Sequence, residues 1–91
     1  MRLSFPNYSR SYDESRNCVC FWGYDSTIEV SFFVETAALM QLSPDMENTE
    51  PGYLKAFDYA LERIHKVADK VYVHGGKGKG AYAYRLAADD F

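Results

Sequence analysis

Two short segments with a period of two restrict the fold more than any other feature of this sequence. In residues 18–22, CVCFW, and in residues 28–34, IEVSFFV, apolar side chains recur at every second position. Successive side chains of a strand point to opposite faces, so the second segment has a nearly pure apolar face and a mixed one. The residues between them, Gly23–Thr27, include turn-forming glycine, aspartate and serine. The pattern predicts a β-hairpin with one face against the core and the other partly wet.

A long amphipathic segment follows the hairpin and can cover it. Its apolar residues recur at helical spacing, at Leu54, Phe57, Leu61, Ile64, Ala68 and Val71. At about 100° per residue they form a stripe roughly 120–140° wide, which is typical of an amphipathic helix. Thr49 is a favourable N-cap, Pro51 is tolerated in a first turn, and Gly75 can end a helix. The pattern predicts one helix from Pro51 to Gly75, packed on the hairpin residues Ile28 and Phe32.

The remaining segments carry shorter patterns. Leu3–Arg16 is polar and rich in serine, which predicts mostly loop, although Leu3–Phe5 could form a short edge strand. Residues 37–42 predict a short helix capped by Thr36. Residues 81–86, in which tyrosine and leucine alternate with alanine and arginine, predict a final strand.

Together these elements predict an α+β fold. We expect one domain over residues 1–91, with an antiparallel three- to four-stranded sheet, one long helix packed on one face and one short helix. A chain of 91 residues suits a single domain. Its apolar content of 47% separates it from disordered chains, which cannot bury enough surface to fold.

Charge and hydropathy restrict the partners and the location. The net charge of −3 disfavours binding to nucleic acid, which depends on neutralising phosphates with basic side chains. No stretch approaches the ~20 apolar residues of a membrane span. The N-terminal residues lack the apolar core of a signal peptide. We therefore expect a cytoplasmic protein without a membrane association.

The segment GGKGKG, residues 75–80, invites a comparison with phosphate-binding loops. A Walker-type loop needs serine or threonine after its glycine-lysine pair, and glycine stands there. Such loops also lead from a strand to a helix N-terminus, whereas this segment leads from a predicted helix to a predicted strand. We interpret it as a flexible connection. The alternative is an anion or partner contact through Lys77, Lys79 and Arg85.

Cys18, Cys20, His65 and His74 are the candidate zinc ligands, but their spacing is unfavourable. Structural zinc sites usually pair ligands two to four residues apart with a second tight pair. Here one residue separates the cysteines, and the histidines are nine positions apart. The sequence predicts no metal site and no cofactor, and it favours reduced thiols on a strand face.

Candidate catalytic residues are few. Asp58 and Glu62 lie four apart on one helix side and could form an acid–base pair, but a solvated charged face explains them as well. His65 lies at the border of the apolar stripe, where structural histidines are common. No serine or cysteine has an identifiable base partner in the sequence, so we assign no catalytic residue and favour a non-enzymatic protein.

Trp22 and Tyr24 are the candidate binding residues. They flank Gly23 at the predicted tip of the hairpin. Tryptophan and tyrosine dominate the energies of protein interfaces, so an aromatic pair at a tip is typical of a binding hot spot. The alternative is that both rings form the edge of the core.

Three stretches carry a resemblance to a known family: SFPNYSRSYDESRNCVCFWGYDSTIEVSFFVETAAL, LKAFDYALERIHKVADKVY and RLAADDF. Its most specific parts are Tyr12-Asp13, Phe21-Trp22-Gly23, Phe57-Asp58, Ile64-His65 and Asp90-Phe91. They resemble a family of small bacterial proteins of unknown function, number 1488 in the domain-of-unknown-function series. The resemblance implies a compact α+β fold in a short soluble protein. It implies no activity, cofactor or site residue.

Three hypotheses about function follow. The first is a small non-enzymatic cytoplasmic protein that contacts a protein partner or itself, at a sheet edge or at Trp22 and Tyr24. The second is a small ligand-binding protein or enzyme with a site formed only in three dimensions, in a pocket gathering His65, His74 or carboxylates. The third, which the net charge disfavours, is nucleic-acid binding through basic residues near the C-terminus.

Overall fold

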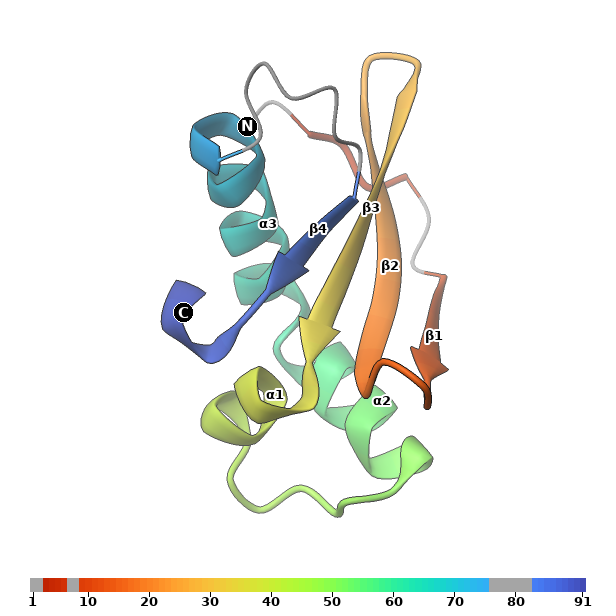
Figure 1. Cartoon of the computed structure of the whole chain (residues 1–91), viewed down its shortest axis with the longest axis vertical. Helices are drawn as coiled ribbons and strands as arrows, with labels where there is room; N and C mark the ends of the chain where they lie inside the picture. The colour runs from red at the N-terminus through yellow and green to blue at the C-terminus, as the bar shows by residue number, and fades with distance from the viewer. Residues whose placement is uncertain (1–2, 7–8, 76–82) are drawn as a thin grey trace.

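A computed structural model describes residues 3–6, 9–75 and 83–91. It contains a four-stranded sheet in the order β1-β2-β3-β4, with helices packed against it (Figure 1). The elements are β1 (Arg10–Asp13), β2 (Cys18–Asp25), β3 (Ile28–Glu35), α1 (Thr36–Leu42), α2 (Glu50–Tyr59), α3 (Leu61–Gly75), β4 (Ala83–Leu86) and the 3-10 turn η1 (Ala88–Asp90). The predicted α+β fold is confirmed, and the sheet, predicted as antiparallel, is mostly antiparallel with one parallel pair.

The hairpin of β2 and β3 is longer than predicted. Asp25 pairs with Ile28, so only Ser26 and Thr27 form the loop, and Ser26 adopts a φ of 60°. Gly23 is therefore a strand residue, and the prediction that it begins the turn is wrong. A Cβ on Gly23 would lie 2.6 Å from a ring carbon of Phe5. The glycine serves this close approach and does not make the turn.

The N-terminal region contains a strand where the sequence predicted loop. β1 pairs antiparallel with β2, and the Tyr12 ring lies 5.0 Å from the Tyr53 ring on α2. A polar strand of four residues is too short to show a clear alternation of apolar and polar residues. Its position is set by pairing with β2 and by the ring contact with α2. Ser4 and Tyr24 exchange two backbone hydrogen bonds of 2.8 Å, which is a single bridge in place of the suggested edge strand.

β4 is parallel to β3, so the sheet is mixed. β3 leads into α1 and α2, and α3 then returns along the sheet toward the end where β3 began (Figure 1). β4 starts from that same end and therefore runs in the direction of β3. The alternation of residues in a strand is the same in either direction, which is why the sequence did not reveal this.

The predicted long helix is two helices. Thr49 caps α2 as predicted, because its hydroxyl accepts a hydrogen bond of 3.2 Å from the Gly52 N–H. At Ala60 the backbone leaves the helical region, with φ −100° and ψ 18°, and α3 begins at the next residue. No glycine or proline stands there, so the break has no signal in the sequence.

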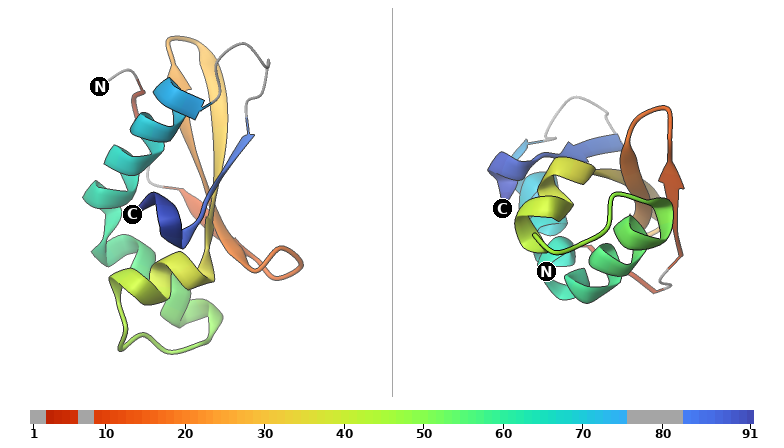
Figure 2. Two further views of the ribbon diagram at one scale, coloured as in Figure 1. Left: turned by 60° about the vertical axis from the view of Figure 1, so that its left-hand side comes forward. Right: turned by 90° about the horizontal axis from the view of Figure 1, so that it is seen from below.

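The two faces of the sheet are unlike. α2 and α3 cover one face, which we call the helix face, and the left view of Figure 2 shows the helices on that side. The buried strand residues of this face are Val19, Phe21, Val30, Phe32, Val34 and Leu86. Phe57 of α2 and Ile64 of α3 are buried against them, as predicted. Ile28 was expected in this seam but is 44% exposed, and it lies at the end of β3 beside the hairpin loop.

Candidate functional site

The opposite face of the sheet is the candidate site, and we call it the open face. Figure 1 views the molecule from this side, with α2 and α3 behind the strands, as the right view of Figure 2, seen from below, also shows. The strand register places on it Ser11 and Asp13 of β1, Cys18, Cys20, Trp22 and Tyr24 of β2, Glu29, Ser31, Phe33 and Glu35 of β3, and Ala83 and Arg85 of β4. Within the described ranges, no helix lies over these residues.

Apolar side chains occupy the middle of the open face. Cys20, Trp22, Tyr24 and Phe33 are each partly exposed. None of the four belongs to the set of half-buried residues that pack against the core. They therefore form a second apolar surface, separated from the core by the sheet itself.

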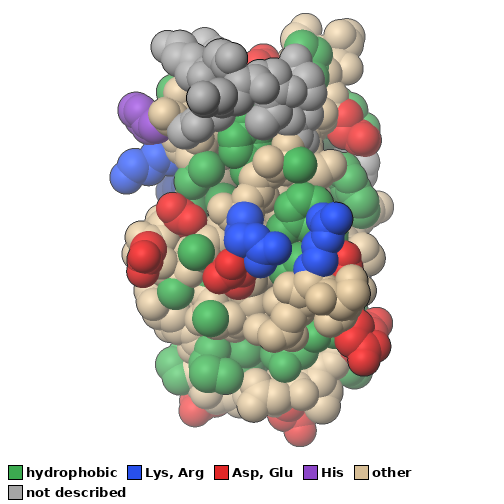
Figure 3. Space-filling view, viewed as in Figure 1, with side chains coloured by type: hydrophobic (Ala, Val, Ile, Leu, Met, Phe, Trp, Pro, Cys, Tyr) green, Lys and Arg blue, Asp and Glu red, His purple; other side chains and the backbone are tan. Residues whose placement is uncertain are grey.

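Arginines lie beside these aromatic rings. The Arg16 guanidinium carbon is 4.8 Å from the centroid of the Phe33 ring, which is a cation–π contact. Arg85 pairs with Phe33 in the strand register and donates a hydrogen bond of 3.0 Å to Glu35. Figure 3 shows basic and hydrophobic side chains side by side in the middle of this surface. Aromatic rings and arginines together are the composition that dominates interface hot spots.

The charges of the open face are arranged along the strands. Glu29 lies near the hairpin loop and accepts a hydrogen bond of 3.2 Å from the Tyr24 hydroxyl. This bond to a carboxylate raises the pKa of Tyr24. Arg16 lies toward the other end, where its Nε is 3.7 Å from an Asp13 carboxylate oxygen. The hairpin end thus carries Glu29, and the opposite end carries Arg16 and Arg85 together with the Asp13 and Glu35 carboxylates that they contact.

The two thiols of the open face are poor nucleophiles. Cys18 is fully buried and Cys20 is partly exposed, and neither is in a disulfide. Burial raises the pKa of both, and that of Cys20 rises to about 11, with the neighbouring Cys18 as a further cause. A thiol needs its thiolate form to react, so these groups are suited to packing at neutral pH.

The four candidate zinc ligands are divided by the sheet. Cys18 and Cys20 lie on the open face, whereas His65 and His74 belong to α3 on the other side. His65 stacks on Phe5, with ring centroids 3.9 Å apart and an interplanar angle of 5°. Burial lowers its pKa. His65 thus anchors the N-terminal segment. Among the described residues, no group of three or more metal-binding side chains gathers in one place.

Asp58 and Glu62, the suggested acid–base pair, do not act together in the structure, because Asp58 is bound by an arginine. Asp58 accepts two hydrogen bonds from Arg10, of 2.9 Å from Nε and 2.7 Å from Nη2. This bidentate pair joins β1 to α2. Glu62 is exposed on α3. The Asp58 carboxylate therefore holds the edge strand.

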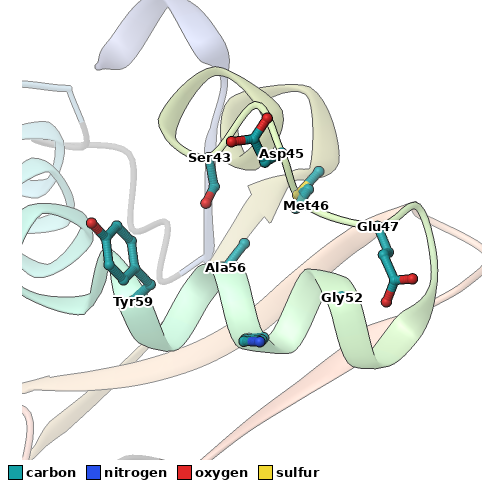
Figure 4. A pocket seen from close by; sticks show the side chains of 8 residues that line it. Ser43, Asp45, Met46, Glu47, Gly52, Ala56 and Tyr59 are labelled. Atoms are coloured by element: carbon teal, nitrogen blue, oxygen red, sulfur yellow. The ribbon is translucent and has the colours of Figure 1, made fainter.

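A cavity of about 360 Å³ lies between α2 and the connection that precedes it (Figure 4). It is lined by Ser43, Asp45, Met46, Glu47, Gly52, Lys55, Ala56 and Tyr59. Figure 4 shows the Asp45 and Glu47 carboxylates pointing in different directions, and the Tyr59 ring at the far end of the helix. Its acidic groups do not converge on one point, as a catalytic pair requires.

A second cavity, of about 370 Å³, lies between the end of α3 and η1. It is lined by Lys70, Val71, His74, Asp89 and Asp90. Asp90 accepts a hydrogen bond of 2.8 Å from the Ala87 N–H, so one of its oxygens is engaged by the backbone. This cavity combines His74 with carboxylates, as the second hypothesis requires, but His65 does not line it.

The structure brings three of the five candidate binding residues to one face. Trp22, Tyr24 and Arg85 all lie on the open face, although the first two are within β2 and not at the hairpin tip as predicted. Lys77 and Lys79 lie outside the described residues, in the segment between α3 and β4. As the sequence order predicted, this segment leads from a helix to a strand.

The sequence reasoning missed the other members of this surface. Phe33 could have been found, because the alternation that places Phe32 in the core places Phe33 on the opposite face. Arg16 lies in the turn after β1 and had no signal, since its contact with Phe33 depends on the fold.

Comparisons with known proteins agree with this architecture. The family "Protein of unknown function (DUF1488)" matches residues 3–83, which confirms the expected resemblance. The crystal structure of a protein of unknown function from the same family, from Shewanella loihica PV-4, is similar to this chain with a TM-score of 0.75. The two chains are 14% identical, and the match covers 90% of each. At that identity the likeness shows the fold alone. No curated protein matches the chain. Within the described residues, no helix has the length and apolar character needed to cross a bilayer.

Proposed function

Since the chain belongs to the DUF1488 family of unknown function, we propose from its structure that it is a small cytoplasmic bacterial protein of one domain that binds protein through the open face. The role is non-enzymatic and consists of contact with another protein chain. The observation that supports it most strongly is the second apolar surface. Trp22, Tyr24 and Phe33 are partly exposed on one side of the sheet while the helices cover the other.

The composition of this surface fits an interface. Protein interfaces are enriched in aromatic residues and arginine at their centres, with a polar rim. Trp22 lies in the middle of the open face, opposite the small Ser31 in the strand register. Arg16 and Arg85 lie beside the Phe33 ring, and their side chains are 54% and 51% exposed. A partner can therefore reach both the rings and the cations.

The reactive side chains of the described chain support binding over catalysis. The thiols have raised pKa values, His65 stacks on Phe5, and Asp58 is held by Arg10. His65 and Asp58 thus join separate segments of the fold, and the thiols stay protonated at neutral pH. General acid–base or nucleophilic chemistry needs such groups aimed at a shared open site.

The test compares Trp22→Ala with a matched control, Tyr59→Ala. Tyr59 is an aromatic residue of α2 that is 83% exposed on the helical side. We expect the wild-type protein and the Tyr59 variant to self-associate in light scattering or to retain the same proteins from a native lysate, and the Trp22 variant to lose this binding. Circular dichroism checks that both variants are folded. Binding that is equal in all three proteins, or absent from all three, would contradict the proposal.

A second candidate function is small-ligand binding in the cavity beside His74. The observation that favours it is the combination of an imidazole, the Lys70 ammonium and two carboxylates around about 370 Å³, a volume within the ordinary range of ligand sites. A thermal-shift screen of charged metabolites against wild type and His74→Ala would test it. A ligand whose stabilisation disappears in the variant would support this function, and no stabilisation by any compound would count against it.

A further inference from the structure

We infer that the chain which occupies the open face is a second copy of this protein, packed face to face so that β3 of one copy crosses β3 of the other in the opposite direction. This inference rests on the proposed function, because it uses the same surface. It goes further by naming the partner and the arrangement. The argument comes from the order of charges along β3 and from the small residue at its centre.

Four residues of β3 lie on the open face, and Glu29 and Phe33 are the two next to Ser31, with Glu35 further along the strand. Glu29 precedes Ser31 by two residues and Phe33 follows it by two, so each lies about 6–7 Å away along the strand. Arg16 lies over the Phe33 ring. An acidic group and a basic group are thus at equal distances on either side of the same small residue.

We place a two-fold axis near Ser31, between the two sheets and perpendicular to the strands. This axis relates the two copies of the dimer. It places Glu29 of each copy opposite Phe33 and Arg16 of the other, so the same ion pair forms twice. Trp22 pairs with Ser31 in the register, and the axis brings the two Trp22 side chains together at the centre. Sheets that pack face to face lie about 10 Å apart with their strands near −30°. Because the strands cross at this angle, residues near the axis stay opposite each other while distant ones move apart. Both Glu29–Arg16 ion pairs lie near the axis.

The charges of the open face favour a second copy of this protein over a partner whose surface is uniformly acidic or uniformly basic. A uniformly acidic partner would be repelled by Glu29 at one end and by Asp13 and Glu35 at the other, and a uniformly basic partner would be repelled by Arg16 and Arg85. An identical face turned by the two-fold axis brings Arg16 of one copy to Glu29 of the other at both ends, while Arg16 and Arg85 also offset the Asp13 and Glu35 carboxylates beside them. Arg16 has donors left for this contact, because its guanidinium carries five N–H groups. Its contact with Asp13 within the chain is long, at 3.7 Å.

Charge exchange at these two positions tests the arrangement. We expect analytical ultracentrifugation to show a wild-type dimer that weakens with added salt. Arg16→Glu and Glu29→Arg should each raise the dimer dissociation constant by roughly tenfold or more, because each places like charges together twice. The double variant should restore most of the wild-type affinity. The matched control is Glu62→Arg, which makes the same charge change on the exposed side of α3 and should leave the dimer unchanged.

Several results would overturn the inference. A wild-type protein that remains monomeric at millimolar concentration excludes the dimer. Equal effects of Glu29→Arg and Glu62→Arg, or a double variant no tighter than the single ones, exclude this arrangement. A monomeric protein that retains a lysate protein only when Trp22 is present would refute the second copy and leave the proposed function standing. A monomer without such a Trp22-dependent partner would refute both.

Discussion

Phe32 and Phe33 are neighbours in one strand, yet they belong to different surfaces. Phe32 is fully buried on the helix face, where its ring lies 5.2 Å from that of Phe21 and 5.7 Å from that of Tyr84. Phe33 is partly exposed on the open face and is covered by the Arg16 guanidinium. The same side chain therefore stabilises the core at one position and, at the next, belongs to the surface that we propose as an interface. The comparison shows that apolar content alone does not identify a core, and that burial by the helices does.

The largest expected difference between the faces is in stability. Phe32→Ala should cost about 3–5 kcal/mol of unfolding free energy, because it leaves a cavity in the core. Phe33→Ala should cost about 1 kcal/mol, since it removes a half-exposed ring and one cation–π contact. Urea denaturation at micromolar concentration, followed by circular dichroism, measures both. Equal costs would show that the open face contributes to the fold as much as the helix face.

A smaller effect is expected from the thiols of the open face. With a pKa of about 11, Cys20 is far less ionised at pH 7.5 than an ordinary cysteine. Alkylation of the native protein should be slower than that of the urea-unfolded chain by roughly ten- to hundredfold, since the greater nucleophilicity of the high-pKa thiolate offsets part of the loss. Mass spectrometry after iodoacetamide treatment measures the rate and the site. The partly exposed Cys20 should react before the buried Cys18. Fast labelling of the native protein at neutral pH would mean that the thiols are not shielded.

The smallest expected effect is the pH dependence of folding stability that comes from His65 of α3. Burial lowers its folded-state pKa, so the unfolded chain binds more protons on this residue as the pH falls below about 6.5. Stability from this source is present above that pH and is lost as the pH falls toward the folded pKa. Tm should therefore fall between pH 7.5 and 5.5.

His65→Phe keeps the stacking on Phe5 and should reduce this dependence, whereas His74→Gln on the exposed end of α3 serves as the control. Differential scanning calorimetry at several pH values measures how Tm changes with pH in each variant. If the His74 variant loses the dependence and the His65 variant keeps it, the buried imidazole is not its source.

Much of the fold was predictable because its signals are local. The alternation of residues 28–34 and the helical spacing of residues 54–71 depend only on neighbouring positions. The Thr49 cap is likewise decided within four residues. β1 and the helix break at Ala60 were not predictable, because they are set by contacts with distant segments. The candidate site follows the same rule. Trp22 and Tyr24 could be chosen by residue type, but their membership of one surface with Arg16 required the fold.

The sequence by itself determined the hairpin, the amphipathic helical segment and the apolar stripe between them, because periodicity fixes which side chains share a face. The tertiary structure decided the direction of β4, the pairing of β1 and the side of the sheet that the helices cover. These depend on how segments far apart in the chain meet. The open face exists for that reason: one sheet has two apolar surfaces, and the helices of the described chain cover one of them.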